Sequence, residues 1–281
     1  MSDNEAVLVT GGAGFIGSHL VDALMEKGLT VTVLDNLSKG TERNLNRWIS
    51  NPRFRLIIGD CLVPKDIAKA IRRCRIVFHL AANPEVRITG DDTRVYLEQN
   101  VIATYNLLEE ARKQREVEAI VFTSTSTVYG EASVIPTPED YGPLEPISLY
   151  GASKLACEAL ISAYCSTYGM KGVIYRLANI IGSRSHHGVI WDFIQKLIEN
   201  PKELVILGDG KQTKSYLLVD DCVDALLVGL EKSRERFEVF NVGSEDWITV
   251  KEIADLTVKE LGLKDVEYQY KPATPDGRGW P

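Results

Sequence analysis

Two side chains in this 281-residue sequence, Tyr150 and Lys154, have a spacing that predicts proton-transfer chemistry. Residues four positions apart lie on one face of a helix, so we expect the phenol and the ammonium to be neighbours. A tyrosine with an ordinary pKa of about 10 is a poor base at neutral pH. A neighbouring ammonium, together with any further positive charge at the site, favours the phenolate and lowers that pKa. The pair therefore predicts a tyrosine acid/base, although the same spacing also occurs on ordinary amphipathic helix faces.

A run of hydroxyl side chains at residues 123–127 follows the apolar stretch 119–122. Several hydroxyls in a row are a poor choice for packing at the end of a buried strand, although a simple polar strand end is the alternative. They would lie where a substrate alcohol could contact a tyrosine acid/base. We therefore interpret the run as part of a site for an alcohol.

Three glycines, Gly11, Gly14 and Gly17, connect a strand-like stretch at 6–9 to a helical pattern at 18–26. A strand that turns on glycines into a helix presents bare backbone N–H groups and a helix N-terminus to an anion such as a phosphate. The spacing is G-x-x-G-x-x-G rather than G-x-G-x-x-G, and a plain strand-to-helix turn is the alternative.

A carboxylate at the right distance strengthens the dinucleotide interpretation. Asp35 lies eighteen residues after Gly17, at the end of the apolar run 31–34. At the end of a second parallel strand, such a carboxylate can bind the ribose hydroxyls of adenosine. It would also repel a 2′-phosphate, so we expect NAD rather than NADP.

The elements that must position these residues alternate between apolar strands and helices. Strands are predicted at 6–9, 31–34, 54–58, 76–80 and 119–122, with a long helix at 92–114. This alternation predicts an α/β fold, a Rossmann-type doubly wound parallel sheet with helices on both faces. Such sheets bind ligands at the carboxyl ends of their strands, and the polar or small residues of this chain follow its strands. Among them, Asp60 is equally well explained as a helix cap or a turn former.

The second part of the chain has a more mixed pattern. A proline-rich loop after Gly130 leads to a long helix at 148–168 and a strand at 173–177, and beyond Asn179 short strands alternate with helices. We expect an NAD-binding Rossmann domain at 1–178. A smaller mixed α/β substrate-binding domain is expected at 179–281, interleaved with the first.

Composition excludes several classes of function. The net charge is −7 and no basic stripe interleaves with aromatic residues, which argues against nucleic acid as a partner. Five cysteines form no Cys-x-x-Cys pair, so no metal site is expected. No apolar run approaches the roughly 20 residues of a membrane-spanning helix. Residues 1–6 do not resemble a signal peptide, so we expect a cytoplasmic protein with reduced thiols.

The sequence resembles the extended short-chain dehydrogenase/reductase family, and within it the nucleotide-sugar epimerases of the UDP-glucose 4-epimerase kind. The resemblance covers essentially the whole chain and is specific for the family more than for its substrate. The motifs that carry it occur in this order: Thr10-Gly-Gly-Ala-Gly-Phe-Ile-Gly17, Asp35-Asn-Leu-Ser38, Gly59-Asp60, His79-Leu-Ala-Ala82, Asn100, Thr125-Ser-Thr-Val-Tyr-Gly130, Tyr150-Gly-Ala-Ser-Lys154, Arg176-Leu-Ala-Asn179 and Gly208-Asp-Gly-Lys-Gln-Thr-Lys-Ser-Tyr-Leu-Leu-Val-Asp-Asp221.

The resemblance implies a role for each matching residue. The implied catalytic residues are Tyr150 as acid/base, Lys154 at the nicotinamide ribose and Thr125 at the reacting hydroxyl. The implied cofactor-binding residues are Gly11, Gly14, Phe15, Ile16 and Gly17 at the pyrophosphate, Asp35, Asn36 and Ser38 near the adenosine ribose, Asp60 and Cys61 at the adenine, and Leu80, Ala81, Ala82, Asn100 and Ser124 along the cofactor channel. The implied substrate-binding residues are Asn83, Thr125, Asn179, Lys214 and Arg278.

Three features depart from the family pattern. Position 125 is a threonine where the epimerases often have serine, and Lys214 replaces an arginine that commonly meets the diphosphate, so a point charge stands where a bidentate fork is usual. The chain ends at Trp280-Pro281, before a final strand and helix that relatives have.

The resemblance implies NAD-dependent 4-epimerisation of a nucleoside-diphosphate sugar, with UDP-glucose and UDP-galactose as the expected pair. Such an isomerase would act in galactose metabolism, as a homodimer formed through the helices at 92–114 and 148–168. The alternatives are a dehydratase, decarboxylase or reductase of sugar nucleotides, or an NAD-binding regulator without chemistry. Dehydratases of the family carry an Asp-Glu pair directly after the active-site threonine, where this chain has Ser126 and Thr127.

Overall fold

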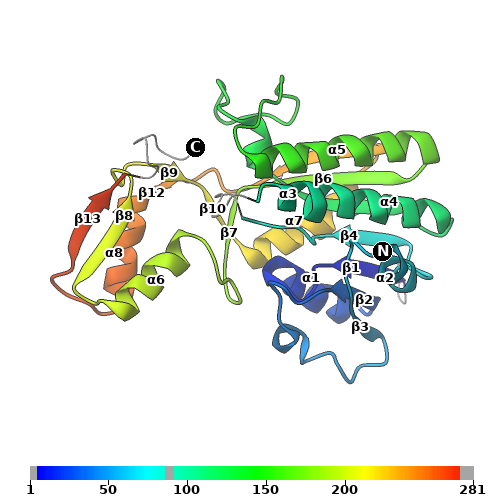
Figure 1. Ribbon diagram of the computed structural model, residues 1–281, viewed down its shortest axis with the longest axis horizontal. Coiled ribbons are helices and arrows are strands. Elements are labelled where there is room, and N and C mark those ends of the chain that lie inside the picture. The colour runs from blue at the N-terminus through cyan, green and yellow to red at the C-terminus, as the bar shows by residue number, and fades with distance from the viewer. Residues whose placement is uncertain (1–4, 86–91, 273–281) are drawn as a thin grey trace. The chain divides into compact units, whose positions relative to one another are not determined.

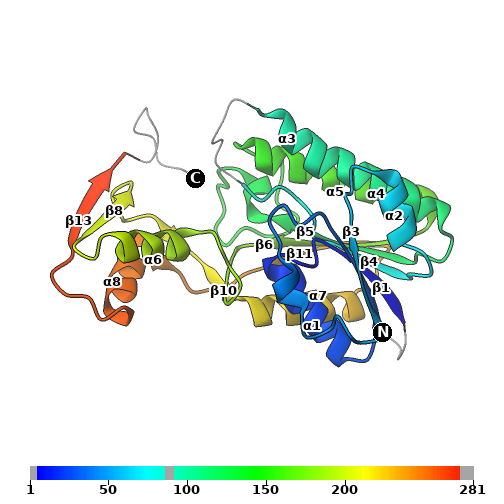
Figure 2. The same ribbon diagram turned by 60° about the horizontal axis from the view of Figure 1, so that its bottom comes forward.

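The computed structural model describes residues 5–85 and 92–272 (Figures 1 and 2). The chain divides into two compact units. The first consists of Met1–Ala178 and Val219–Val242, and the second of Asn179–Leu218 and Gly243–Pro281. Each is described by itself below.

The first unit is built on a seven-stranded parallel sheet with the order β11-β6-β5-β4-β1-β2-β3. From β1 the chain adds β2 and β3 on one side, then crosses over to add β4, β5 and β6 on the other. This reversal between β1 and β4 is the switch point at which such sheets bind ligands. The strands are β1 (Ala6–Thr10), β2 (Thr30–Asp35), β3 (Phe54–Ile58), β4 (Ile76–His79), β5 (Ala119–Thr125), β6 (Lys171–Leu177) and β11 (Phe237–Val242).

Helices cover both faces of this sheet, as the apolar character of its strands requires. Helices α1 (Phe15–Glu26) and α7 (Val219–Lys232) lie on one face, and α2 (Pro64–Ala70), α4 (Ala103–Lys113) and α5 (Leu149–Tyr168) on the other (Figures 1 and 2). A continuous core on the second face joins side chains of the strands to those of α2, α4 and α5, among them Val77, Leu107 and Ile161. The predicted Rossmann-type α/β fold is confirmed.

The described residues of the second unit form three two-stranded sheets and two helices. Its strand pairs are β7 (Asn179–Ile181) with β10 (Tyr216–Leu218), β9 (Thr213–Lys214) with β12 (Ile248–Thr249), and β8 (Glu203–Leu207) with β13 (Glu267–Lys271). Helices α6 (Val189–Glu199) and α8 (Val250–Glu260) pack on them around a small core that includes Phe193, Leu204 and Ile253.

The assignment of all of 179–281 to the smaller domain is wrong for Val219–Val242, which belongs to the first unit. Strand β11 pairs in parallel with β6 and forms an edge of the large sheet, while α7 packs against α1. A short apolar strand looks alike in either domain. Its long-range partner decides the assignment, and the local pattern does not show that partner.

The predicted helix at 92–114 is interrupted. It consists of α3 (Arg94–Tyr96), a π-helical turn η2 (Leu97–Ile102) and α4. Two 3₁₀ turns, η1 (Glu42–Leu45) and η3 (Ser126–Tyr129), complete the helical elements of the described first unit. The π turn carries the buried side chain of Asn100, and π turns occur frequently at functional sites.

Where the chain is described, none of its helices combines the length and the apolar character needed to cross a bilayer.

The glycine turn generates a test of the fold. A Cβ added at Gly17 would overlap the carbonyl oxygen of Gly11, so Gly17→Ala should force the turn open. We expect a loss of about 1–3 kcal/mol in the free energy of unfolding, the usual cost of overpacking, and weaker NAD binding. Denaturant unfolding and an NAD titration measure both. The matched control is Gly142→Ala, because a Cβ there meets nothing within 4 Å. Equal behaviour of the two variants would contradict the close approach at Gly17.

Candidate active site

The glycine turn joins β1 to α1 at the switch point of the sheet. Gly11 has a φ of +70°, and a Cβ there would lie 2.7 Å from the backbone nitrogen of Ala81. Gly14 is the N-cap of α1. Because glycine has no side chain, the first N–H groups of the helix have no side-chain cap. This end of α1, with Phe15 and Ile16 in its first turn, therefore has the donors and the dipole that a pyrophosphate needs.

Asp35 holds this turn in place. One carboxylate oxygen accepts a hydrogen bond from the Ala13 N–H at 2.9 Å, and the other accepts from the Leu37 N–H at 2.8 Å. Burial raises the pKa of Asp35, and the two backbone hydrogen bonds oppose that rise. Each oxygen retains acceptor capacity for a ribose hydroxyl.

The adjacent strand ends form a polar cluster. Asn36 donates from Nδ2 to Asp60 Oδ2 at 2.9 Å and accepts from the Ser38 N–H at 3.0 Å. Asp60 Oδ1 accepts from the Leu62 N–H at 2.8 Å, so Asp60 does form a turn in addition to any cofactor contact. Cys61 is buried beside it. The structure thus brings together the residues predicted near adenosine, while their contact with the cofactor stays a prediction.

Asn100 connects three segments of the site. Its Oδ1 accepts from the Asn83 N–H at 2.7 Å, and its Nδ2 donates to Ser153 Oγ at 2.8 Å. The Ser153 hydroxyl in turn donates to the Tyr150 carbonyl at 2.7 Å. Asn100 therefore ties the loop after β4, which also contains Leu80, Ala81 and Ala82, to the first turn of α5.

A buried histidine that the sequence analysis did not single out lies beneath this loop. His79 Nδ1 is 2.7 Å from Thr10 Oγ1, and His79 Nε2 is 2.9 Å from Thr104 Oγ1. The pKa of His79 is lowered to about 3, mainly by burial and to a smaller extent by the Lys154 charge, so the ring is neutral. A lone polar residue inside an apolar strand was the signal that could have identified it.

The hydrogen bonds around His79 assign its proton. The Thr104 hydroxyl donates to the Asn100 carbonyl at 2.7 Å, so Nε2 is the donor to Thr104. Nδ1 of the neutral ring then accepts from the Thr10 hydroxyl, whose oxygen also accepts from the Ala81 N–H at 3.2 Å. A continuous chain of donors and acceptors therefore runs from the end of β1 to the π turn.

The three predicted catalytic residues come together at the end of β5 and the start of α5. Thr125 is the last residue of β5, and Tyr150 and Lys154 lie in the first two turns of α5. Thr125 hydrogen-bonds to the Tyr150 side chain. The Lys154 ammonium is buried and lies 4.3 Å from the centroid of the Phe122 ring.

In the chain by itself the pKa of Tyr150 is raised, and its lowering in the presence of the cofactor stays a prediction. Burial raises the pKa of Tyr150 to about 12, and the hydrogen bond with Thr125 only partly opposes it. Burial also lowers the pKa of Lys154 to about 8, against the raising effects of Cys157 and Glu158. The sequence argument counted the attraction of the ammonium and omitted the desolvation of the phenolate. The remaining positive charge that the argument invoked belongs to an oxidised nicotinamide.

The Ser124 hydroxyl has a hydrogen-bond partner within the protein. It is buried and donates to the carboxylate of Glu158 on α5. The predicted contact of Ser124 with the cofactor stays a prediction.

The predicted substrate residues of the second unit are neighbours there. Asn179 Nδ2 donates to the Ser215 carbonyl at 3.0 Å, and Lys214 immediately precedes Ser215 on the chain. Lys214 pairs with Ile248 between β9 and β12. Arg278 lies outside the described residues.

A turn suited to a pyrophosphate, next to a buried lysine and a tyrosine that bonds a threonine hydroxyl, defines the class of dinucleotide-dependent enzymes acting on alcohols. The model of the NAD dependent epimerase/dehydratase family matches residues 7–243. The chain belongs to this family, and its cofactor is NAD.

Individual relatives agree with this assignment. A putative UDP-glucose 4-epimerase of Methanocaldococcus jannaschii is 36% identical over 273 residues, which cover 95% of this chain and 86% of that protein. UDP-glucuronic acid decarboxylase 3 of Arabidopsis thaliana is 36% identical over 281 residues, which cover 97% and 79%. A crystal structure of UDP-galactose 4-epimerase is 42% identical, with a TM-score of 0.85 and coverage of 98% and 87%. The chain is thus similar to nucleotide-sugar enzymes of more than one reaction type.

Asp35 should determine the choice of cofactor. Removing its charge in Asp35→Asn should raise the affinity for NADP relative to NAD about tenfold or more, because two like charges some 4 Å apart repel by about 1–4 kcal/mol. Titrations with both dinucleotides measure the ratio. Asp60→Asn, the control, removes a charge that lies by the predicted adenine site and should leave the ratio near the wild-type value. An unchanged ratio in Asp35→Asn would place the 2′-position elsewhere.

Proposed function

We propose that this protein is an NAD-dependent 4-epimerase of nucleoside-diphosphate sugars that interconverts UDP-glucose and UDP-galactose. The observation that carries the proposal is the group formed by Thr125, Tyr150 and Lys154, followed by neutral side chains at positions 126 and 127. Similarity to a putative UDP-glucose 4-epimerase and to a UDP-galactose 4-epimerase supports the choice of substrate.

The residues of the chain move and hold a proton at the 4-hydroxyl of the sugar. Bound NAD supplies the acceptor for the hydrogen at C4 and gives it back in the return step. Thr125, already bonded to the phenol, orients the hydroxyl, and the Tyr150 oxygen takes its proton and later returns it. Lys154, one turn further along α5, offsets the charge of the phenolate. The 4-keto sugar then turns over before it is reduced on its other face, which inverts C4.

The diphosphate has to hold the part of the substrate that does not react. Asn179 and Lys214, neighbours in the second unit, are proposed to bind it, with Arg278 as a further cation. Anchoring the nucleotide through its diphosphate leaves the hexose free to turn.

Neutral residues after Thr125 argue against a dehydratase. The Thr127 hydroxyl lies 3.2 Å from the Thr125 hydroxyl, and Ser126 is exposed. Neither side chain can protonate a departing 6-hydroxyl near neutral pH, because hydroxyls do not titrate there.

A decarboxylase is the second candidate, favoured by the similarity to UDP-glucuronic acid decarboxylase 3. The same oxidation at C4 would turn a sugar with a C6 carboxylate into a β-keto acid, which loses carbon dioxide when the C5–C6 bond breaks. The resulting enolate would take a proton at C5 before the 4-ketone is reduced. A regulator without chemistry is disfavoured, because it would have no use for the Thr125–Tyr150–Lys154 group.

We also propose a homodimer. Exposed apolar side chains gather on η2, α4 and the end of α5, namely Leu97, Ile102, Tyr105 and Tyr168. Burying this face between two copies would remove apolar surface from water.

Tyr150→Phe should abolish turnover by about 10²–10⁴-fold or more, since it removes the proton-transfer group. Folding and NAD binding should remain nearly unchanged, as measured by thermal unfolding and by titration. Tyr270→Phe, at an exposed tyrosine of β13, is the matched control. Retention of more than a tenth of wild-type turnover in Tyr150→Phe would assign the acid/base role to another residue.

An isotope experiment separates the candidate reactions. UDP-glucose labelled with deuterium at C4 should give UDP-galactose that keeps the label at C4, without consumption of added NAD. NMR and mass spectrometry of the products measure this. A 4-keto-6-deoxy product would indicate a dehydratase. Turnover of UDP-glucuronic acid to a pentose nucleotide, with UDP-glucose left unchanged, would indicate a decarboxylase.

A further inference from the structure

A buried ion pair lies next to the proposed catalytic residues. Arg176 on β6 and Glu158 on α5 have side chains that are only 5% and 6% exposed. Arg176 Nη2 donates to Glu158 Oε2 at 2.8 Å, and Nε lies 3.2 Å from Oε1 and 3.3 Å from Oε2. The contact is therefore a fork between guanidinium and carboxylate, the strongest geometry of this kind.

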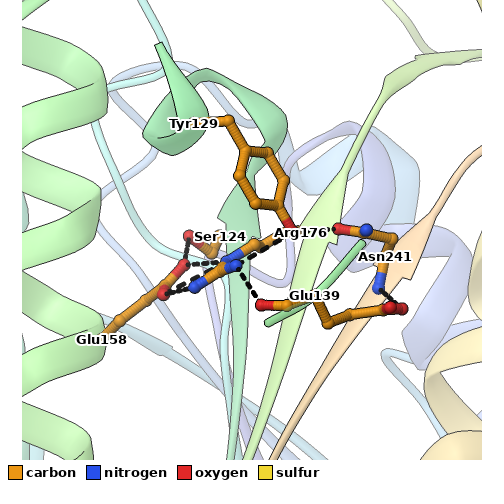
Figure 3. Close-up of polar contacts among 6 residues, drawn as sticks. All are labelled: Ser124, Tyr129, Glu139, Glu158, Arg176 and Asn241. Atoms are coloured by element: carbon orange, nitrogen blue, oxygen red, sulfur yellow. Dashed lines mark hydrogen bonds and ion pairs between the residues drawn. The ribbon is translucent and has the colours of Figure 1, made fainter. Parts of the chain in front are cut away.

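The pair belongs to a row across three strands. Ser124 on β5, Arg176 on β6 and Asn241 on β11 are register partners. Each is the last residue but one of its strand, and on β5 the last residue is Thr125. The Ser124 hydroxyl donates to Glu158, as Figure 3 shows. Arg176 Nη1 donates to Tyr129 Oη at 2.9 Å, and the Tyr129 hydroxyl donates to Asn241 Oδ1 at 2.8 Å.

The same row holds the loop that leads to Tyr150. Arg176 Nη1 also donates to the Glu139 carbonyl at 3.1 Å, and the Asn241 N–H donates to the Glu139 carboxylate at 2.9 Å (Figure 3). Asn241 Nδ2 donates to the Thr137 carbonyl at 2.8 Å. Residues 137 and 139 lie between η3 and α5, so Arg176 is bonded to the chain on both sides of Tyr150, and Asn241 to the side that precedes it.

Stability alone does not account for this pair. Two buried charges must be stripped of water, and well-packed apolar side chains of similar size are often at least as stabilising. What the pair has in common with the catalytic group is position. Glu158 follows Lys154 by one turn of α5, as Lys154 follows Tyr150, and Ser124 precedes Thr125.

The charges around Lys154 show what the pair contributes. Glu158 and Cys157 lie next to it on α5, and both raise its pKa. His79 faces it from β4 and is neutral. With its carboxylate unpaired, Glu158 would attract the Lys154 ammonium away from the tyrosine and disfavour the phenolate. Arg176, from β6, bonds both carboxylate oxygens and offsets part of that charge.

We infer that Glu158 and Arg176 are positioning residues for the proposed reaction: Glu158 holds Ser124, and with it Thr125, against α5, while Arg176 neutralises Glu158 and leaves the Lys154 ammonium to Tyr150 and the cofactor. The inference rests on the proposed acid/base role of Tyr150 and not on the identity of the sugar.

Charge neutralisation is tested by titrating Tyr150 in the NAD-loaded protein, from the ultraviolet difference between each variant and its Tyr150→Phe counterpart. Glu158→Gln leaves an unpaired positive charge and should lower the pKa of Tyr150 by about one unit, and Arg176→Met leaves a negative charge and should raise it by about one unit. The double variant should return close to the wild-type value. Glu109→Gln removes the carboxylate of an ion pair on neighbouring α4 and is the matched control, with no expected shift.

The same tyrosine pKa in all of these variants would overturn the inference, since a purely structural pair moves stability and not the titration. This readout needs no substrate, so absence of epimerisation would refute the proposed function and leave the inference standing.

Positioning is tested by Arg176→Lys, which keeps the charge and loses the fork, and which is expected to fold even where the single neutral variants do not. It should leave the tyrosine pKa within a few tenths of a unit of wild type and lower kcat at least about fivefold, with KM nearly unchanged. Wild-type kcat in this variant would overturn the positioning role.

Discussion

Polar groups buried at the carboxyl edge of the large sheet must have partners, and the site is organised by this constraint. The strands are mostly apolar, and several of them carry a buried hydroxyl, imidazole or charged group at or just before their last residue. An unpaired polar group there costs about 1–3 kcal/mol, and an unpaired charge more. Continuous hydrogen-bond chains meet this demand, one from Thr10 through His79 to Asn100 and one from Ser124 through Glu158 to Arg176. Each element that carries a functional side chain is thereby fixed to its neighbours.

The same burial determines the proton chemistry. It raises the pKa of Tyr150 to about 12 and lowers that of Lys154 to about 8, so near neutral pH the phenol is neutral while the lysine remains mostly an ammonium. A phenolate at Tyr150 therefore needs positive charge close to it. Because Arg176 pairs with Glu158, the Glu158 carboxylate competes less for the charge of Lys154. The proposed proton transfer by Tyr150 therefore depends on Glu158 and Arg176 as well as on the residues that would contact the substrate.

Local signals carried much of the prediction from sequence. The glycine turn, Asp35 and the Tyr150–Lys154 spacing are short-range patterns whose backbone consequences do not depend on distant residues. Alternating strands and helices predicted the parallel sheet for the same reason. Val219–Val242 was misassigned because its place depends on pairing with β6, which the local pattern does not reveal.

What the sequence could not show involves partners far apart along the chain or the cost of burial. Ser124 bonds a residue thirty-four positions away, and His79 is joined to Thr10 across sixty-nine. The π turn that brings Asn100 inward has no distinct periodicity over so few residues. The direction of the Tyr150 shift follows from desolvation, which the spacing of two residues does not report.

We propose that the edge of the sheet around Gly11–Gly17 and Asp35 holds NAD against Tyr150. Mass spectrometry of the small molecules released on denaturing the purified protein, after incubation with a mixture of NAD and NADP and removal of the excess, tests it most directly. The account predicts about one dinucleotide per chain, NAD in large excess over NADP, and its loss in Gly17→Ala. A protein that retains no dinucleotide, or that retains NADP equally well, would contradict it.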